Sequence, residues 1–310
     1  MNVNVRPDHD DRIARARLAL EGLSVGDAFG QCFFRPEIGK LLIRREPPRA
    51  PWLWTDDTAM ALSIVDVLDV HEEIDQDALA ADFARRYRDD PRRGYGTGAH
   101  QYLGEIVSGA PWRDVARAVF HGQGSLGNGA AMRVAPVGAY FEDDLDQVVE
   151  EARRSAEVTH AHAEGQAGAI AIAVAAALAW RHRLGPERPR WPFEDEPSAF
   201  VAAVMERTPA GETRKGLEQA LTLGPSASIA SAAALLGNGS RVIAPDTVPL
   251  CVWAAARFGG SFEEALWQTV SALGDRDTTC AIVGGIVVLA IGLDGVPLAW
   301  REARESLSGR

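Results

Sequence analysis

The stretch AIAIAVAAALA, residues 169–179, consists of alanine and branched apolar residues and lies within a longer apolar run, 167–180. Alanine is the strongest helix former, and its small side chain lets helices approach closely. A helix that is apolar on all sides is buried in a protein centre or crosses a membrane. This run and the one at 281–293 are shorter than the ~20 residues that a membrane span needs. Both are therefore expected to be buried helices.

Most of the remaining chain also carries helical patterns. Residues 12–23 are rich in Ala, Leu and Arg, and the apolar residues between 61 and 68 have the spacing of one helical face. The best candidate for a strand is KLLIRR, residues 40–45, and its alternation is weak. These patterns predict a compact, all-α bundle. Its further helices are expected at 147–158, 167–183, 198–206, 226–236, 247–257 and 262–273.

A proline-rich stretch, HRLGPERPRWPFEDEP at 182–197, interrupts the helical patterns. Its prolines exclude a continuous helix, because proline lacks the backbone N–H and clashes with the preceding turn. Helical patterns of the same kind resume after it. We therefore expect a surface excursion within a single domain that spans residues 1–310.

The composition narrows the classes of function. The net charge is −11, from 32 basic and 43 acidic residues. A protein that binds nucleic acid nonspecifically, or a membrane surface, carries a basic surface instead. Cys32, Cys251 and Cys280 are far apart and form no CxxC pair, as is typical of a reducing compartment. The sequence predicts a cytoplasmic protein without a membrane partner and without nonspecific nucleic-acid binding.

Two clusters of acids and threonines each precede an apolar run. One interpretation is helix capping, because Thr is a good N-cap and acids stabilise the first turn of a helix. The other is a metal site made by both clusters, since carboxylates gathered in one place repel one another unless a cation offsets their charge. Carboxylate and hydroxyl oxygens suit Mg²⁺ or Mn²⁺ rather than zinc. The clusters are Thr55, Asp56, Asp57 and Thr58, and Asp275, Asp277, Thr278 and Thr279.

The chain resembles the ADP-ribosylglycohydrolases, a family that includes the dinitrogenase reductase-activating glycohydrolase and the hydrolases of ADP-ribosyl-arginine and ADP-ribosyl-serine. The resemblance runs from about residue 15 to 293 and rests on segments that occur in the family's order. These are GLSVGDAFG (22–30), WTDDT (54–58), RGYGTG (93–98), GSLGNGAAMRVAP (124–136), VTHAH (158–162) and GDRDTTCAIVGG (274–285).

The resemblance implies a fold and a cofactor. The fold is an all-α, compact orthogonal helical bundle, and the cofactor is a pair of Mg²⁺ or Mn²⁺ ions. Asp277 would bridge the two ions. The implied metal ligands are Thr55, Asp56, Asp57, Asp275, Asp277 and Thr278.

The glycine-rich segment GSLGNGAAMR, residues 124–133, has two interpretations. Its Asn-Gly pair is typical of a turn, and its glycines also let backbone N–H groups approach an anion closely. In the family this loop holds the diphosphate and ribose of the ligand. The resemblance therefore implies ligand contacts from Gly124, Ser125, Gly127, Asn128 and Gly129, whereas Met132 is expected in the core.

Two further segments are each open to a structural and a functional interpretation. GYGTG (94–98) is either a plain loop or, as the resemblance implies, a segment beside the ligand through Tyr95, Gly96 and Gly98. His160 and His162 are two positions apart and cannot share a helix face, so one is expected buried and one exposed. The resemblance favours His160 as a polar contact in the ligand pocket and leaves His162 without a role.

The chain departs from the family at two positions. Relatives of the dinitrogenase reductase-activating and ADP-ribosyl-serine types carry a glutamate seven residues after the aspartate of the first motif, and counting from Asp27 gives Phe34. The nearest acid is Glu37, a candidate substitute with water as the alternative. Leu126 stands where the serine-specific enzymes have an aromatic residue that contacts adenine. These differences favour the arginine-linkage branch or a branch with another substrate.

The implied reaction is hydrolysis of the bond between the anomeric carbon of ADP-ribose and an acceptor, with an arginine guanidino nitrogen favoured. The metals would orient the ribose hydroxyls and lower the pKa of a water. The candidate catalytic residues are Asp56, Asp57, Asp277 and Glu37, and either Asp56 or Asp57 would pass a proton to the leaving nitrogen. Two alternatives stay open: a metal-dependent phosphohydrolase, and an ADP-ribose-binding protein on the same fold without catalysis.

Overall fold

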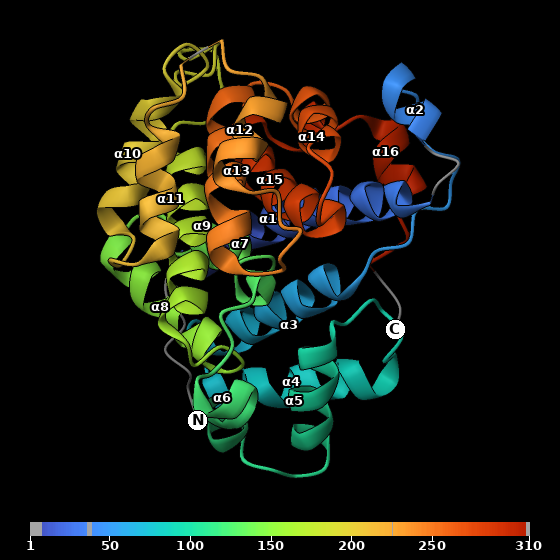
Figure 1. Ribbon diagram of the computed structural model, residues 1–310, viewed down its shortest axis with the longest axis vertical. Coiled ribbons are helices and arrows are strands. Elements are labelled where there is room, and N and C mark those ends of the chain that lie inside the picture. The colour runs from blue at the N-terminus through green and yellow to red at the C-terminus, as the bar shows by residue number, and fades with distance from the viewer. Residues whose placement is uncertain (1–7, 36–38, 225, 308–310) are drawn as a thin grey trace.

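The computed structural model describes residues 8–35, 39–224 and 226–307, and Figure 1 shows the arrangement of its helices. Within these ranges the chain is built of α-helices and short 3₁₀ turns, and β-type pairing occurs only as isolated bridges. The predicted all-α class is therefore confirmed. The α-helices are α1 (His9–Gln31), α2 (Gly39–Arg44), α3 (Asp56–His71), α4 (Gln76–Asp89), α5 (Thr97–Val107), α6 (Trp112–Gly122), α7 (Ala135–Tyr140), α8 (Leu145–Glu157), α9 (Ala163–Arg181), α10 (Pro197–Arg207), α11 (Glu212–Ala220), α12 (Ile229–Leu236), α13 (Ala244–Phe258), α14 (Phe262–Ser271), α15 (Arg276–Ile291) and α16 (Leu298–Ala303).

Every helix predicted from the sequence is present, although its ends differ by several residues in places. Residues 40–45, the weak candidate for a strand, are helical, because Gly39–Arg44 form α2. Leu41 and Leu42 of this helix pack against the core, whereas Ile43 is exposed. A helix satisfies its backbone hydrogen bonds internally, so this short segment needs no neighbouring strand. The 3₁₀ turns are Cys32–Phe34, Asn128–Ala130 and Leu293–Gly295.

Helix α1 lies at the centre of the fold and makes its most extensive contact with α15 (Figure 1). Gly22, Gly26 and Gly30 follow one another at intervals of four along the face that meets α15. A methyl group added to Gly26 would lie 2.1 Å from the carbonyl oxygen of Cys280. One added to Gly30 would lie 2.2 Å from the carbonyl oxygen of Arg276. The two helix backbones are therefore in direct contact, which only glycine permits.

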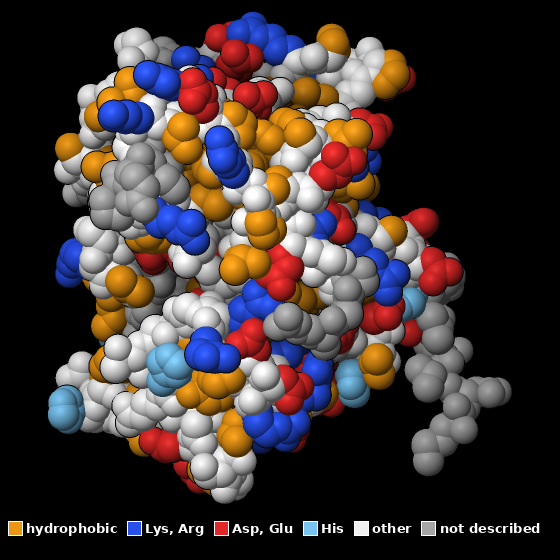
Figure 2. All heavy atoms as spheres, turned by 90° about the vertical axis from the view of Figure 1, so that its right-hand side faces the viewer, with side chains coloured by type: hydrophobic (Ala, Val, Ile, Leu, Met, Phe, Trp, Pro, Cys, Tyr) orange, Lys and Arg blue, Asp and Glu red, His pale blue; other side chains and the backbone are white. Residues whose placement is uncertain are grey.

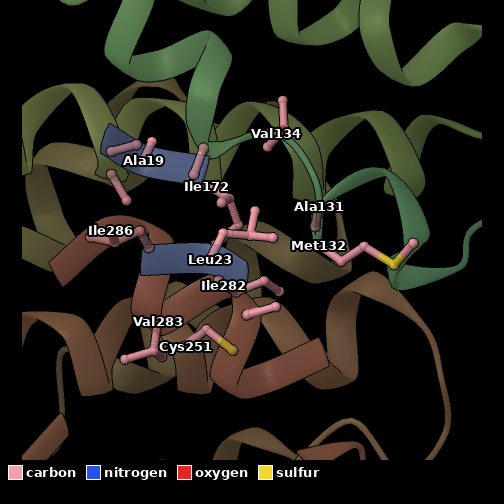
Figure 3. Close-up of a cluster of buried hydrophobic side chains, with 14 of the residues drawn as sticks. Ala19, Leu23, Ala131, Met132, Val134, Ile172, Cys251, Ile282, Val283 and Ile286 are labelled. Carbon is pink, nitrogen blue, oxygen red and sulfur yellow. The ribbon is translucent and has the colours of Figure 1, made fainter. Parts of the chain in front are cut away.

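The hydrophobic core continues on both sides of this helix pair. Figure 3 shows Leu23 of α1 among Ile282 and Ile286 of α15 and Ile172 of α9, and all four are almost completely buried. Helix α9 contains the alanine-rich stretch and packs against α7, α8, α13 and α15. It is long and apolar enough to cross a membrane by composition, but 78% of its most apolar stretch is buried inside the protein. The structure therefore uses α9 as a central core helix, as the sequence predicts.

The proline-rich excursion at 182–197 is fastened to the core by an aromatic anchor. Trp191 is only 2% exposed, and its ring nitrogen donates a hydrogen bond of 2.7 Å to the carbonyl oxygen of Ala256 on α13. The ring of Trp191 also packs against the rings of Phe193 and Phe200. The excursion is therefore held against α13 and α10.

The surface in Figure 2 carries basic and acidic side chains that are interspersed over the whole view. This face has no continuous basic stripe of the kind that a nonspecific nucleic-acid binder presents. The arrangement agrees with the acidic net charge of −11.

The backbone contact between α1 and α15 predicts a large difference between two glycine-to-alanine substitutions. Gly26→Ala places a methyl group on a carbonyl oxygen, and such overpacking costs about 1–3 kcal/mol or more. Gly104→Ala on α5 meets no atom within 4 Å and gains helix propensity, which contributes about 0.5–1 kcal/mol. Urea unfolding should show Gly26→Ala less stable and Gly104→Ala slightly more stable than the natural protein. Equal stabilities for the two variants would contradict the contact.

Candidate functional site

The N-terminal ends of α3 and α15 meet beside a cavity of about 610 Å³, within the range of small-molecule sites. The predicted clusters enter it from both helices, although they are more than 200 residues apart in the sequence. Residues 125–129 of the glycine-rich loop line the same cavity. The lining residues are Asp56, Asp57, Gly94, Gly96, Thr97, Gly98, Ala99, Tyr102, Phe120, Ser125, Leu126, Gly127, Asn128, Gly129, Met132, His160, Arg241, Val242, Ile243, Asp275, Asp277 and Thr278.

Asp27 of α1 fixes the start of α3. Its fully buried carboxylate accepts hydrogen bonds from the backbone N–H groups of Thr55 (2.8 Å) and Thr58 (3.1 Å). It also accepts from the hydroxyls of Thr55 (2.8 Å) and Thr58 (2.5 Å). A residue from another helix thus satisfies the first-turn donors that would otherwise lack partners. The sequence interpretation missed this role of Asp27.

The capping interpretation of Thr55 is wrong, because the side chain of Thr55 caps no backbone N–H of α3. Its hydroxyl oxygen lies 2.8 Å from Asp27 Oδ1 and 2.9 Å from Asp57 Oδ2. One hydroxyl proton can serve only one of these two carboxylate oxygens. The other oxygen of Asp57, Oδ1, is buried and has no hydrogen-bond partner among the described residues. This arrangement leaves negative oxygen atoms in need of a proton or a cation.

The second cluster is ordered by its own helix and by the glycine-rich loop. The backbone N–H of Thr278 donates to Asp277 Oδ1 at 2.9 Å. Asn128 donates from its amide to Asp275 Oδ2 at 2.7 Å and to the hydroxyl of Thr247 at 3.1 Å. Asp275 does not cap α15 with its side chain. Both carboxylates therefore remain turned toward the cavity that they line.

Burial raises the pKa of Asp27 and of the four acids in the two clusters. It raises the pKa of Asp27 to about 6, against the hydrogen bonds from Thr58 and Thr55 that lower it. The pKa of Asp56 rises to about 7 through burial and then through the charge of Asp27. The pKa values of Asp57 and Asp277 are raised well above the usual range, by burial and then by neighbouring carboxylates, and the pKa of Asp275 is also raised by burial. A group of acids with this electrostatic cost is ready to bind a cation.

The donor set fits a hard divalent cation. Asp57 Oδ1 has no hydrogen-bond partner among the described residues, and the one hydroxyl proton of Thr55 serves only one of two neighbouring carboxylate oxygens. A bound ion would offset the negative charge on these oxygens. No three Asp, Glu, His or Cys side chains surround one point in the part of the chain that the structure describes. A metal site here would therefore draw on hydroxyl oxygens as well, and Thr55 and Thr278 stand beside the acids in that role.

The glycine-rich loop divides into a buried part and a part that faces the cavity. Ser125, Gly127, Asn128 and Gly129 line the cavity, as does Leu126. Gly124 lies behind them with a φ of +74°, and a methyl group there would lie 2.6 Å from the backbone nitrogen of His162. The loop is held in place by bonds to the segment 242–244, from Asn128 N to Val242 O and from Ala244 N to Leu126 O.

His160 is 2% exposed and lines the cavity, where the resemblance implied a ligand contact. His162 is instead the N-cap of α9, and its ring nitrogen accepts from the backbone N–H of Glu164 at 3.1 Å. Gly96 and Gly98 also line the cavity. Tyr95 is buried beside the rings of Tyr87 and His100 and is not among the lining residues, so its ligand contact stays a prediction.

Two apolar side chains of the cavity were missed by the sequence interpretation. Phe120 and Val242 are each 54% exposed, and both have left-handed backbone angles, with φ of 54° and 56°. Each turn contains a glycine, Gly122 after Phe120 and Gly239 before Val242. A glycine predicts a turn but does not tell which neighbouring side chain lines a cavity. Arg241, the neighbour of Val242, is the one cationic side chain among the described lining residues. These residues place apolar groups and a positive charge beside an otherwise acidic cavity.

Phe34, where the chain departs from its family, lies beside the second acid cluster. The ring of Phe34 is 45% exposed and lies 5.3 Å from the guanidinium carbon of Arg276, the residue between Asp275 and Asp277. Phe34 therefore contributes no oxygen to the acid clusters. Glu37, the candidate substitute, lies outside the described residues, and its catalytic role stays a prediction.

Comparisons with known proteins identify a family. The family model described as ADP-ribosylglycohydrolase matches residues 8–309. ADP-ribosylhydrolase ARH3 from Bos taurus is 32% identical over 330 residues, which cover 94% of this chain and 89% of the relative. ARH3 from Homo sapiens is 32% identical over 275 residues, covering 81% and 74%.

A second kind of relative is more distant. The ADP-ribosylarginine hydrolase Tri1 of Pseudomonas putida is 24% identical over 312 residues, covering 94% of this chain and 75% of that protein. A solved structure described as an ADP-ribosylglycohydrolase-related protein complex superimposes with a TM-score of 0.67 at 26% identity, covering 96% and 94% of the two chains. On these matches, and on the site that its helices form, the chain belongs to the ADP-ribosylglycohydrolase family.

Proposed function

We propose that this protein hydrolyses the glycosidic bond between the anomeric carbon of ADP-ribose and an acceptor, with divalent metal ions bound between the N-termini of α3 and α15. One observation carries the proposal. Acid–threonine clusters from two distant parts of the chain line one cavity of about 610 Å³ together with residues 125–129 of the glycine-rich loop. Acids that can hold a cation and a glycine-rich loop that a ligand can approach closely suit a ligand that joins a ribose to a diphosphate.

The proposed metal ligands are those implied by the sequence, namely Thr55, Asp56, Asp57, Asp275, Asp277 and Thr278, with two Mg²⁺ or Mn²⁺ ions. Bound ions would supply Lewis acidity and would lower the pKa of the attacking water. Asp27 itself accepts four hydrogen bonds from Thr55 and Thr58. It therefore acts behind the site by orienting Thr55 and the first turn of α3.

Different residues of the chain would have different roles in the reaction. The glycine-rich loop would hold the ligand, and the carboxylates of the same cavity would stabilise the positive charge that develops on the ribose as its bond to the acceptor breaks. The water oxygen forms the new bond to the anomeric carbon, and its proton passes to a carboxylate. Asp56 or Asp57 delivers a proton to the leaving acceptor atom. Tyr102 and Phe120 cover the apolar part of the cavity.

The proposed acceptor is arginine, and this preference rests on two side chains. Phe34 and Leu126 replace the glutamate and the aromatic residue that are typical of serine-linkage relatives. The relatives with higher identity are named only as ADP-ribosylhydrolases, and the relative named for arginine is 24% identical. The acceptor must therefore be tested directly.

Incubation with ADP-ribosyl-arginine and ADP-ribosyl-serine peptides, with Mg²⁺ or with EDTA, tests the reaction. We expect release of ADP-ribose from the arginine peptide, dependent on the metal, with slower release from the serine peptide. Faster release from serine would overturn the arginine preference alone. Release of phosphate would identify a phosphohydrolase, and binding of ADP-ribose without any release would identify a binding protein.

The metal proposal predicts a rise in melting temperature with Mg²⁺ or Mn²⁺. A ligand at 100 times its dissociation constant stabilises the folded state by roughly 2.7 kcal/mol, equivalent to about 5 °C for a chain of this size. Asp277→Ala should abolish the rise and lower turnover by ~100-fold or more, since it removes a ligand. Ser125→Ala should keep the rise and lower turnover by roughly tenfold or less, the cost of one hydrogen bond.

Asp294→Ala is the control for the loss of a negative charge, because Asp294 is exposed and lies outside the cavity. It should leave both the melting temperature shift and turnover unchanged. A natural protein whose melting temperature is the same in EDTA and in excess metal would contradict the metal site.

The raised pKa values predict that the metal-free protein loses stability as the pH rises. The folded-state pKa is about 6 for Asp27 and about 7 for Asp56, above the ordinary value of 3.8. Protonation therefore favours the folded state, so this stabilisation is present below about pH 4 and is lost as the pH passes 6 to 7. A pKa that is higher by one in the folded state than in the unfolded state corresponds to about 1.4 kcal/mol. Urea unfolding in EDTA should show a falling free energy of unfolding between about pH 5 and 8.

Asp57→Asn should make this fall shallower, and excess Mg²⁺ should do the same for the natural protein. Asp294→Asn should leave the slope as it is. The contrary result is a free energy of unfolding in EDTA that stays constant or rises over this pH range, both in the natural protein and in Asp57→Asn. Such a result would show that the pKa values of the buried acids are not raised.

A further inference from the structure

Arg133, Thr159 and His160 form a buried chain of hydrogen bonds that ends at the cavity. Their exposed fractions are 0%, 1% and 2%. A terminal guanidinium nitrogen of Arg133, Nη2, donates to the hydroxyl oxygen of Thr159 at 2.8 Å. That oxygen lies 2.7 Å from Nδ1 of His160. The sequence interpretation assigned no role to Arg133.

The chemistry of these three groups fixes the direction of each hydrogen bond. A guanidinium has donors and no acceptor, so the oxygen of Thr159 must accept from Arg133. Among the described residues, Nδ1 of His160 is the acceptor within reach of the Thr159 hydroxyl proton. A buried hydroxyl without an acceptor is costly, so the hydroxyl donates to Nδ1. Nδ1 is then the bare nitrogen, and the ring proton lies on Nε2.

The nitrogen Nε2 of His160 faces the glycine-rich loop. A methyl group added to Gly127 would lie 3.3 Å from Nε2, and one added to Gly129 would lie 3.5 Å from it. No hydrogen-bond partner for Nε2 is present among the described residues, although His160 lines the cavity. A donor is therefore aimed into the space beside the loop, and the glycines keep that space open.

We propose that Arg133, acting through Thr159, is a positioning residue that holds His160 with its proton on Nε2, as a hydrogen-bond donor to a ligand oxygen held by the glycine-rich loop. The fixed proton and its direction follow from the contacts of this chain alone. The nature of the ligand, ADP-ribose, rests on the proposed function.

The surroundings of His160 also keep it neutral. Burial and then the positive charge of Arg133 lower its pKa to about 3. Neutral His160 thus has one N–H donor and cannot gain a second proton near neutral pH. It therefore supplies a hydrogen bond and does not serve as the base of the reaction.

This role accounts for an otherwise costly feature of the core. Arg133 is completely buried and no carboxylate hydrogen-bonds it among the described residues; its partners there are Met60, the carbonyl oxygen of Ser155 and Thr159. Its guanidinium also lies 4.4 Å from the ring centre of Phe83. Burial lowers its pKa to about 10, so it remains charged at neutral pH. The charge of Asp56 acts on Arg133 and opposes this lowering, but no carboxylate among the described residues hydrogen-bonds the guanidinium. Burying a cation without such a hydrogen bond is costly, and the proposed positioning of His160 gives this cost a function.

Nitrogen-15 NMR of the histidine rings tests the proposal on the intact protein. The chain has seven histidines, and His160→Gln identifies the signals of His160 by their loss. In the natural protein we expect a bare Nδ1 and a protonated Nε2, unchanged from about pH 8 to 5, well above the pKa of about 3. Thr159→Ser keeps the hydroxyl and should keep this pattern. Thr159→Val removes it and should give a mixture of both ring forms.

Arg133→Met frees the Thr159 hydroxyl and should produce the same mixture, provided that circular dichroism shows a folded protein. If Arg133→Met does not fold, Thr159→Val decides. A proton on Nδ1 in the natural protein overturns the proposal, and so does a single Nε2–H form in Thr159→Val. If folded Arg133→Met shows only the Nε2–H form, Arg133 does not position the ring proton of His160.

Titration with ADP-ribose tests the ligand contact separately. Binding should shift the Nε2–H signal of the natural protein, and Thr159→Val should bind at least twofold more weakly because only part of its His160 carries the proton on Nε2. Thr159→Ser should bind like the natural protein. Binding without a shift of Nε2–H overturns the donor role. Absence of any ADP-ribose binding contradicts the proposed function, while the ring-proton measurement still decides the positioning by Arg133.

Discussion

The structure depends on the backbone contact between α1 and α15. Glycines at every fourth position of α1 let the two helices approach until carbonyl oxygens of α15 lie where a side chain would otherwise begin. The contact at Gly30 involves Arg276 and Asp277, so it sets the place where α15 begins. Between two of these glycines, Asp27 reaches across to the first turn of α3. One helix thus positions both acid clusters, and the cavity exists because the two clusters are held at its edge.

The acids are held there at an electrostatic cost. Burial raises the pKa values of the five carboxyl groups, and the charges of neighbouring carboxylates raise those of Asp56, Asp57 and Asp277 further. If the acids served only to cap α3 and α15, they could be exposed, because exposed acids stabilise the start of a helix by a similar amount. Capping alone therefore does not explain why the acids are buried together. One oxygen of Asp57, Oδ1, is also buried without a hydrogen-bond partner among the described residues, which adds to the electrostatic cost. A bound cation, as proposed, would offset both, and the surrounding core would supply the stability that keeps the acids in place before it binds.

The sequence predicted the elements of this site better than their assembly. Acids and threonines before apolar runs are visible in a sequence, and so is a glycine-rich loop. The function of Asp27 was not visible, because a single acid inside a long helix has the same appearance whether it faces solvent or another helix. Phe120 was missed because the nearby Gly122 predicts a turn but not the side chain that lines the cavity. KLLIRR stayed a weak candidate for a strand because six residues are too few to separate the two periodicities, and it is helical. The position of Arg133 behind His160 depends on tertiary packing alone.

The most direct test of the central claim is anomalous diffraction at the manganese edge from crystals grown with Mn²⁺ and ADP-ribose. The account predicts two manganese peaks between the N-termini of α3 and α15. Their ligands should come from Thr55, Asp56, Asp57, Asp275, Asp277 and Thr278, with Asp277 touching both ions. ADP-ribose should lie in the same cavity with its diphosphate against residues 124–129. Fully occupied ADP-ribose without manganese between the helices, or manganese bound only elsewhere, would contradict the claim that the contact of α1 with α15 builds a metal centre for this ligand.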